Sequence, residues 1–500
     1  MKRTAGILLN VSSFPGKYGI GGFSCNAEHF LNEFAGMGFG LWQTLPITAL
    51  GGGASPYSGI SSYAGNYLYI DLERLDGLLT KEELAAAEYK GGIYLTDYAY
   101  ARETKTRCLK LAYSRVTKEI QAKIDEFKKQ NEYWLLDYVA FMTLKVIKEG
   151  KCWPDWGEEA KYTKTLVKKV IKENKEIAGY FFFEQYYFYK QWTALKAYAN
   201  NLGIKVFGDL PIYVCLDSVE VWVNKKEFLL DSKNVPIEEA GVPPDYFSEV
   251  GQLWGNPLYN YEVMKKNDYK WWTDRIIHSL KLYDVLRIDH FRGLYEYWAV
   301  PYGEETAKNG KWKKGPDMEL FEALYRRIPK EEVNIIAEDL GILDDGVDDF
   351  LERSGFPGMR VIQFAFDGDK TNRHLPHNYK KNMSCYTSTH DNDTTLGWLL
   401  TLGYDTLKEA FEYVDCDLSY GWADGAGQCR ATRAFIKCLM QSVADVVVIP
   451  MQDLCGYGND TRMNLPGTTK GCWEYRTNYT ALNAVDHGYI RHLIYTYGRK

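Results

Sequence analysis

Short apolar runs alternate with amphipathic helical segments along most of the chain. Eight runs contain apolar residues at consecutive positions and are bounded by turn residues, and each is predicted to form a β-strand. Helical patterns lie between them, such as 318–328, where Leu320, Phe321 and Leu324 share one face. The order of strand followed by helix predicts a parallel sheet. The eight predicted strands are 5–10, 39–47, 204–214, 283–289, 333–339, 359–366, 383–391 and 445–453.

The closure of this sheet is predicted from the strands themselves. Strands with apolar residues at consecutive positions are buried on both faces. Eight of them separated by helices favour an α/β fold of the (β/α)8 TIM barrel type. A doubly wound open sheet is the alternative, but no GxGxxG motif follows a predicted strand and opens a helix. We therefore predict a single (β/α)8 barrel over residues 1–500 with inserted, mainly helical subdomains.

Two insertions are predicted from the uneven spacing of the strands. Residues 85–200 contain lysine-rich helical patterns and the aromatic run YFFFEQYYFYKQW, and we expect them to form an inserted helical subdomain. A second insertion is expected over 215–282. Within it, 239–262 is rich in proline, glycine and aromatic residues and is interpreted as a long surface loop, with 241–257 as an active-site loop.

Composition and charge narrow the class of protein. The chain is 46% hydrophobic and 25% charged, which is typical of a globular protein, and its net charge of −6 argues against a nucleic-acid partner. Its ten cysteines lack the spacing of a zinc site, which fits reduced thiols in the cytoplasm. The apolar run at the start is too short for a signal peptide, and no run is long enough to span a membrane. We expect a cytoplasmic protein without a membrane partner.

Acidic residues stand at the ends of several predicted strands. In barrels of this type the loops after the strand ends form the functional face. One such acid can simply cap the following helix. Several carboxylates on one rim repel each other, and burial raises the pKa of at least one, so this rim points to chemistry. Cleavage of a glycosidic bond uses such a pair. The strand-end acids are Asp209, Asp289, Glu338, Asp339, Asp391 and Asp453.

Arg287 stands two residues before Asp289 in the run VLRIDHFRG. A neighbouring guanidinium favours the ionised form of a carboxyl group, so Asp289 is expected to be ionised and weakly basic, with a low pKa. This favours Asp289 as a nucleophile.

The motifs RIDHFRG at 287–293, AEDLG at 337–341 and STHDND at 388–393 resemble the strand-end motifs of the α-amylase superfamily. The chain is most similar to its amylomaltase branch, the 4-α-glucanotransferases. The resemblance covers most of the chain and is weak only over the 85–200 insertion. It also rests on the motifs ASPYSGISSYAGNYLYIDLE, GDLPIYV, DSVEVW, GVPPDYFSEVGQLWGNP, FAF with LPHNY, and NLPGT.

The resemblance implies a role for individual residues. Asp289 would be the nucleophile, Glu338 the general acid and base, and Asp391 the residue that stabilises the transition state through sugar hydroxyls. For Asp367 and the loop residues, a turn or local packing is the alternative. After NLPGT, where the family leads us to expect an asparagine followed by tryptophan and arginine residues, this chain reads TKGCWEYR, so no role is assigned there. The implied sugar-binding residues are Tyr57, Asp209, Tyr246, Phe247, Gln252, Trp254, Asn256, Arg287, His290, Asp367 and His390.

The predicted activity is the transfer of α-1,4-glucan segments from a maltooligosaccharide or starch donor to a glucose or glucan acceptor. The resemblance implies a retaining double displacement through a covalent glucosyl-enzyme. No metal and no organic cofactor is expected, because the clusters DGDK and DDGVDD lack the ligand spacing of a calcium loop. The alternatives are an α-glucan hydrolase with the same three acids and a catalytically inactive glucan-binding protein. The oligomeric state is not predicted.

Overall fold

Eight parallel strands form one sheet in the computed structural model, which describes residues 2–244, 248–341, 345–419, 421–468 and 470–500. The strand order is β10-β11-β12-β1-β2-β3-β6-β9. Each strand overlaps one of the eight runs predicted from the sequence, so the (β/α)8 barrel is confirmed. The strands are β1 (Thr4–Leu8), β2 (Leu41–Gln43), β3 (Lys205–Leu210), β6 (Val285–Ile288), β9 (Ile335–Ala337), β10 (Gly358–Val361), β11 (Met383–Tyr386) and β12 (Val446–Pro450).

The barrel is almost closed. β1 pairs in parallel with both β2 and β12, which joins the first strand to the last. At the two ends of the strand order, the Ala337 N–H in β9 donates to the carbonyl of Pro357, just before β10, at 2.8 Å. The strands therefore surround a common core.

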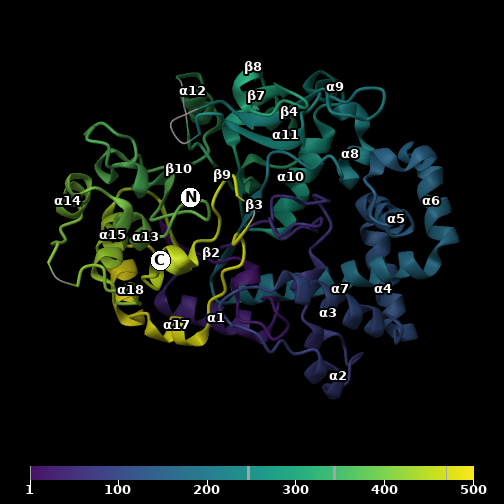
Figure 1. The fold of residues 1–500 in the computed structure, drawn as a ribbon, viewed down its shortest axis with the longest axis horizontal. Helices are drawn as coiled ribbons and strands as arrows, with labels where there is room; N and C mark the ends of the chain where they lie inside the picture. The colour runs from purple at the N-terminus through teal and green to yellow at the C-terminus, as the bar shows by residue number, and fades with distance from the viewer. Residues whose placement is uncertain (1, 245–247, 342–344, 420, 469) are drawn as a thin grey trace.

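Helices cover the outside of the barrel (Figure 1). α1 buries Phe30, Leu31 and Phe34, and α11 buries the three residues Leu320, Phe321 and Leu324 that the sequence places on one face. Each such side chain contributes roughly 1.5–3 kcal/mol when it is removed from water. The surrounding helices are α1 (Cys25–Met37), α10 (Lys270–Leu282), α11 (Met318–Tyr325), α12 (Asp345–Ser354), α13 (Thr395–Thr401), α14 (Tyr404–Tyr413), α15 (Arg430–Gln441), α16 (Met451–Leu454), α17 (Tyr479–Ala484) and α18 (His487–Thr496).

The segment between β2 and β3 is helical and lies beside the barrel, in blue in Figure 1. Its longest helix, α7, binds the loop after β2 through two glutamines. The carboxamide of Gln185 bonds both the N–H and the carbonyl of Gly65, at 2.8 and 3.0 Å, and Gln191 does the same with Asp71 at 2.7 and 3.0 Å. The helices are α2 (Lys81–Ala86), α3 (Tyr98–Tyr113), α4 (Lys118–Gln130), α5 (Glu132–Ile147), α6 (Lys164–Glu173) and α7 (Lys175–Asn201).

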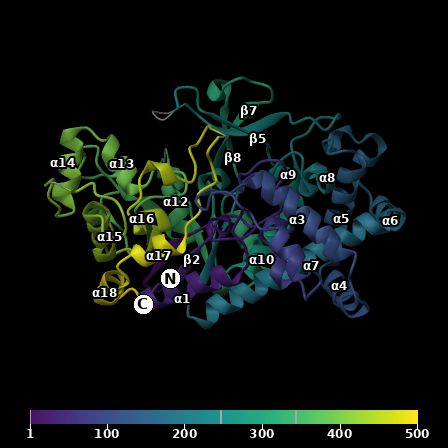
Figure 2. The same cartoon turned by 60° about the horizontal axis from the view of Figure 1, so that its bottom comes forward.

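A second, antiparallel sheet with the order β5-β4-β7-β8 lies over one end of the barrel, at the top of Figure 2. It comprises β4 (Glu238–Val242), β5 (Gln252–Pro257), β7 (Glu296–Pro301) and β8 (Lys311–Lys314). The interpretation of 239–262 as a surface loop was wrong, because β4 and β5 pair there and the short helices α8 (Val219–Val223) and α9 (Tyr261–Lys266) flank them. The edge strand β8 reads KWKK, and lysines on an edge strand discourage pairing with other chains.

Within the described part of the chain, we find no helix that combines the length and the apolar character needed to cross a bilayer.

Candidate active site

A cleft of about 1030 Å³ contains most of the residues predicted to act on sugars. Asp209 and His390 do not line it. Both are buried behind its wall, where they contact residues that do. Tyr246 and Phe247 lie outside the described residues. The predicted residues that line the cleft are Tyr57, Gln252, Trp254, Asn256, Arg287, Asp289, His290, Glu338, Asp367 and Asp391.

The register of the barrel sets Asp289 beside Glu338. Ile288 of β6 pairs with Ala337 of β9, and the two acids are the next residues on these strands. The Glu338 N–H donates to the carbonyl of Ile288 at 3.0 Å, which continues the ladder by one step. Neighbouring strands lie about 4.8 Å apart, so the two carboxyl groups leave adjacent strands at the same level.

Arg287 is the centre of a buried ionic network below these acids. Its Nε and Nη2 donate to the two carboxylate oxygens of Asp209 at 2.8 and 2.7 Å, and Nη2 also donates to Asp289 Oδ1 at 2.9 Å. The side chain of Asp209 is fully buried, whereas that of Asp289 is 29% exposed toward the cleft. Asp209 therefore holds the guanidinium, and Asp289 keeps one oxygen free of that contact.

The electrostatics of Asp289 differ from the expectation. Burial raises the pKa of Asp289, Arg287 opposes this, and the negative charges of Asp209 and Asp391 add to it. The prediction of a low pKa was wrong, because Arg287 is shared with Asp209 and cannot offset burial alone. Asp289 is less acidic than an ordinary aspartate.

Glu338 is held by backbone donors. Its Oε2 accepts from the N–H of His290 and its Oε1 from the N–H of Leu340, both at 2.7 Å. Burial and the negative charge of Asp289 nevertheless raise its pKa, against the opposing effect of Arg287 and the two N–H groups. His290 has a left-handed backbone, with φ of 50°, which turns its N–H toward Glu338. This acid retains a proton to a higher pH than Asp289 does.

The pKa of Asp391 is shifted in the opposite direction, downward. Burial alone would raise its pKa, but His390 and a hydrogen bond from Asn464 outweigh it, so the pKa lies below the usual range. Asn464 Nδ2 donates to Asp391 Oδ1 at 2.6 Å, and His390 Nε2 lies 3.2 Å from Oδ2. The side chain is 47% exposed to the cleft. Asp391 is therefore an anion on the surface of the cleft at neutral pH.

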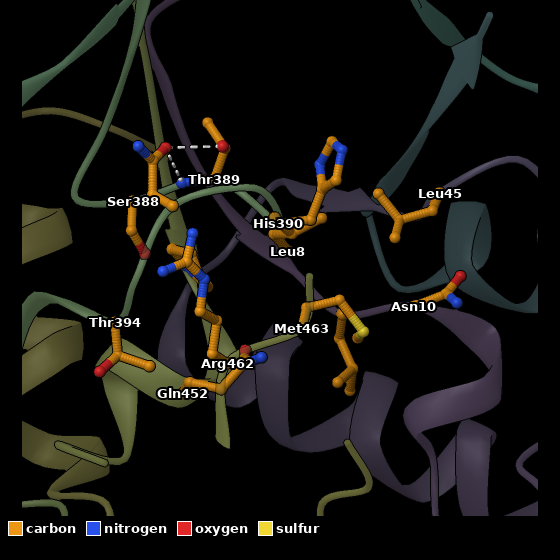
Figure 3. A pocket seen from close by; sticks show the side chains of 13 residues that line it. Leu8, Asn10, Leu45, Ser388, Thr389, His390, Thr394, Gln452, Arg462 and Met463 are labelled. Atoms are coloured by element: carbon orange, nitrogen blue, oxygen red, sulfur yellow. Dashed lines mark hydrogen bonds between the residues drawn. The ribbon is translucent and has the colours of Figure 1, made fainter. Parts of the chain in front are cut away.

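His390 and Tyr57 form one hydrogen-bonded stack. Their rings are stacked with centroids 5.2 Å apart, and Tyr57 Oη lies 2.8 Å from His390 Nε2. Tyr57 donates its own proton to Asp209 Oδ2 at 2.5 Å. Its oxygen is therefore an acceptor for His390, which places a proton on Nε2. In Figure 3 the ring of His390 projects away from Arg462 and Met463, and a small cavity of about 20 Å³ lies behind it.

The β4–β5 hairpin forms one wall of the cleft. Gln252, Leu253, Trp254 and Asn256 of β5 all line the cleft. Trp254 stands edge-on to His290, with ring centroids 4.9 Å apart. Asp367 also lines the cleft and accepts from the Asp369 N–H and from Asn372 Nδ2.

Two of the strand-end acids do not face the cleft. Asp339 is 2% exposed and accepts from the Met359 N–H and from Arg360 Nη1, at 2.5 and 2.7 Å. Asp453 is fully buried and accepts from the hydroxyl groups of Thr387 and Ser388, both at 2.6 Å. These two carboxylates stabilise the barrel.

Sequence reasoning overlooked three residues near the cleft. Asn464 opens the motif NLPGT, which was noted without a role for any member. Arg462 donates to the backbone carbonyls of Asp391 and Asn464, both at 2.7 Å. Trp473, in the segment that departs from the family pattern, lines the cleft next to Asn464. A tryptophan beside a polar motif was the available signal.

The fold and the site together define a class. A (β/α)8 barrel whose cleft sets a carboxyl group with a raised pKa beside a second carboxyl group on the neighbouring strand is built to act on glycosidic bonds.

Comparison with known proteins narrows this class. The family model described as 4-alpha-glucanotransferase matches residues 9–481. A 4-alpha-glucanotransferase of Clostridium butyricum is 41% identical over 98% of this chain and 100% of its own length, and one of Aquifex aeolicus is 42% identical over 100% of both chains. The structure of the amylomaltase from Streptococcus agalactiae in complex with acarbose superposes with a TM-score of 0.93 at 34% identity, covering 100% of both chains. The chain belongs to the 4-α-glucanotransferase family, and its function is glucan transfer.

Proposed function

We propose that this enzyme moves α-1,4-glucan segments by a retaining double displacement with Asp289 as nucleophile. Asp289 attacks the anomeric carbon, and Glu338 gives its proton to the departing glycosidic oxygen, so the donor is split and a glucosyl ester forms on Asp289. In the second half, the ionised Glu338 takes the proton from an acceptor hydroxyl, which attacks the anomeric carbon and releases Asp289. The donor is a maltooligosaccharide or starch chain, and the acceptor is glucose or a glucan.

The observation that carries this proposal is the in-register position of Asp289 and Glu338 on β6 and β9. A retaining mechanism needs the two carboxyl groups about 5–5.5 Å apart, which is close to the separation of neighbouring strands. An inverting enzyme needs a wider gap that admits a water molecule. Two acids that follow paired residues fit retention.

The protonation tendencies support the assignment of roles. Burial raises the pKa of both acids, and that of Glu338 is raised further because Glu338 adjoins the anion of Asp289, whereas Arg287 bonds directly to Asp289. At neutral pH the pair then carries one proton, which resides on Glu338. Asp391, which stays ionised, is proposed to accept hydrogen bonds from sugar hydroxyls as positive charge develops at the anomeric carbon.

Sugar binding is proposed for the two walls of the cleft. Tyr57 and His290 would contact the sugar at the cleaved bond, and Gln252, Trp254 and Asn256 on the hairpin would be further sugar contacts. Asp209, Arg287 and His390 are proposed to hold these groups in place. The hairpin matters because transfer requires that a sugar hydroxyl, rather than water, reaches the intermediate. The loop 241–257, which contains β5, is proposed as the part of the cleft that favours transfer.

A cytoplasmic location stays a prediction.

The test is incubation of the purified enzyme with maltotriose alone, with products followed by chromatography. We expect glucose together with a ladder of longer chains. Asp289→Asn should lower the rate by at least about 10³-fold, because a neutral amide cannot form the ester. Asp268→Asn, at an exposed aspartate that pairs with Arg326, is the matched control and should retain activity. Glucose and maltose without longer chains would identify a hydrolase, and an active Asp289→Asn would exclude this nucleophile.

The intermediate can be tested separately with Glu338→Gln. A donor with an acidic leaving group, such as α-maltosyl fluoride, needs no proton from Glu338 in the first step. The glycosyl ester should then accumulate on the peptide that contains Asp289, where mass spectrometry detects it. An adduct on another peptide would contradict the proposal.

A further inference from the structure

Trp473 has a conformation that a tryptophan rarely adopts. It lies in the segment TKGCWEYR, to which the sequence assigned no role. Its φ is 69°, in the left-handed region, where a residue with a β-carbon is strained. Such strain persists only where surrounding contacts impose it, and it is concentrated at functional sites.

Contacts from two distant parts of the chain impose this conformation. The Trp473 N–H donates to the carbonyl of Met463 at 2.6 Å, and its carbonyl accepts from Tyr98 Oη at 2.8 Å. On the next residue, the Glu474 carbonyl accepts from the Thr96 N–H at 2.6 Å. Helix α3 of the inserted segment, which begins at Tyr98, is therefore linked directly to the backbone of Trp473.

The indole ring that results is in contact with both members of the Tyr57–His390 stack. Its centroid lies 5.7 Å from that of Tyr57 and 5.8 Å from that of His390. It is 7% exposed, and the exposed part faces the cleft. Tyr57 in turn donates to Asp209 Oδ2, and His390 Nε2 lies between Tyr57 Oη and Asp391 Oδ2. Three aromatic rings thus stand between the inserted helices and the carboxylates.

We propose that Trp473 is a positioning residue for glucan transfer, whose indole holds the rings of Tyr57 and His390 together so that His390 stays against Asp391. The inference rests on the proposed function of these carboxylates. A ring that is almost fully buried between two others has little surface left to stack on a sugar. Its main effect is therefore on the arrangement of the groups that act, and Tyr98 contributes by fixing its backbone.

The experiment compares Trp473→Phe, Trp473→Ala and Tyr98→Phe with the unchanged enzyme, using maltotriose. Trp422→Phe is the matched control, since Trp422 packs on Phe411 and does not line the cleft. For Trp473→Ala we expect kcat to fall by about 10²-fold with little change in KM, because a displacement of about 1 Å in the reacting groups has an effect of that size. Trp473→Phe and Tyr98→Phe should show smaller losses in the same direction.

The pH profile supplies a readout that a general loss of stability would not move. The charges that face Asp289 are those of Arg287, Asp209, Asp391, His390 and Glu338. His390 and Arg287 favour its anion and the others oppose it. If His390 moves away in Trp473→Ala, the acidic limb of the profile should shift to higher pH. The limb in Trp422→Phe should not move.

Two results would overturn the proposal. A raised KM with unchanged kcat and an unshifted acidic limb would mean that Trp473 binds sugar directly. A lower melting temperature with unchanged kcat per folded molecule would mean that it only stabilises the fold. A crystal structure of Trp473→Ala tests the same point without any activity: the distance from Tyr57 Oη to His390 Nε2 should exceed about 3.5 Å, the limit of a hydrogen bond. If the unchanged enzyme transferred no glucan, the proposed function would fail while this structural test remained decisive.

Discussion

Two groups of acids stand at the strand ends of this barrel, and they differ in what surrounds their oxygens. Asp339 and Asp453 are buried and are bonded by donors from neighbouring loops and strands. Asp289 and Asp391 are partly exposed to the cleft, with side-chain exposures of 29% and 47%. The carboxylates of the first group accept hydrogen bonds only from within the protein, whereas those of the second also face the cleft, where a ligand can donate to them.

The difference teaches that exposure to the cleft, rather than the strand-end position, separates the buried acids from those proposed to react. Asp453 accepts from two hydroxyl groups and also from the N–H and hydroxyl of Thr395, at 2.7 and 2.9 Å. Removing such an acid leaves several buried donors without partners, each at about 1–3 kcal/mol.

The largest contrast is expected between Asp391→Asn and Asp453→Asn. Asp391→Asn should lower kcat by about 10³-fold, because it removes a charge that is proposed to stabilise the transition state. Asp453→Asn should lower the free energy of unfolding by about 3 kcal/mol and leave kcat per folded molecule within a few fold. Calorimetry and maltotriose kinetics on both variants measure this. Equal effects on kcat per folded molecule would abolish the distinction between the groups.

The pH dependence sharpens the comparison within the cleft. Burial raises the pKa of Asp289 to about 6 and, together with the charge of Asp289, that of Glu338 to about 8. In the proposed mechanism Asp289 acts as the anion and Glu338 as the acid, so kcat/KM should fall about tenfold per pH unit below about 6 and above about 8. A plot of kcat/KM for maltotriose against pH between 4 and 10 should be bell-shaped. A profile without an alkaline limb would remove Glu338 as the acid.

A smaller effect is expected at Glu184 in α7, a buried acid with few donors. Burial raises its pKa from 4.5 to about 7, and Gln185 Nε2 donates to its Oε1 at 3.3 Å. A raised pKa in the folded state means that its contribution to stability is present below about pH 4.5 and is lost as the pH rises through about 7. Glu184→Gln should therefore stabilise the protein by about 2 kcal/mol at pH 8 and hardly at pH 4.5. Denaturation at both pH values checks this, and a gain that does not depend on pH would contradict it.

The barrel could be predicted from the sequence because its strands are buried on both sides. The run VVVIP in β12 is apolar at every position, which no other environment explains as well. The antiparallel sheet could not be predicted in the same way. β5 reads QLWGNP because its polar side chains face the cleft, and β8 reads KWKK because it is an edge. Neither sequence shows the regular alternation of apolar and polar residues by which a half-buried strand is predicted.

The positions of the site residues could be predicted in part. Strand-end acids follow from the barrel, and the motifs named Asp289, Glu338 and Asp391. The sequence did not predict which groups contact each carboxylate oxygen. Beside His390, Asn464 lowers the pKa of Asp391, and the contacts that hold Trp473 come from Tyr98 and Met463. Such long-range contacts depend on the folded path of the loops.

β9 and β10, at the two ends of the strand order, are joined more lightly than the other neighbouring strands. The Ala337 N–H donates to the carbonyl of Pro357, and Asp339 links the strand ends by accepting from the Met359 N–H and from Arg360 Nη1. Glu338 follows β9 and therefore stands at this junction. Amide exchange should be faster along this junction than in the other strand pairs, which would place the most easily opened part of the barrel wall beside Glu338.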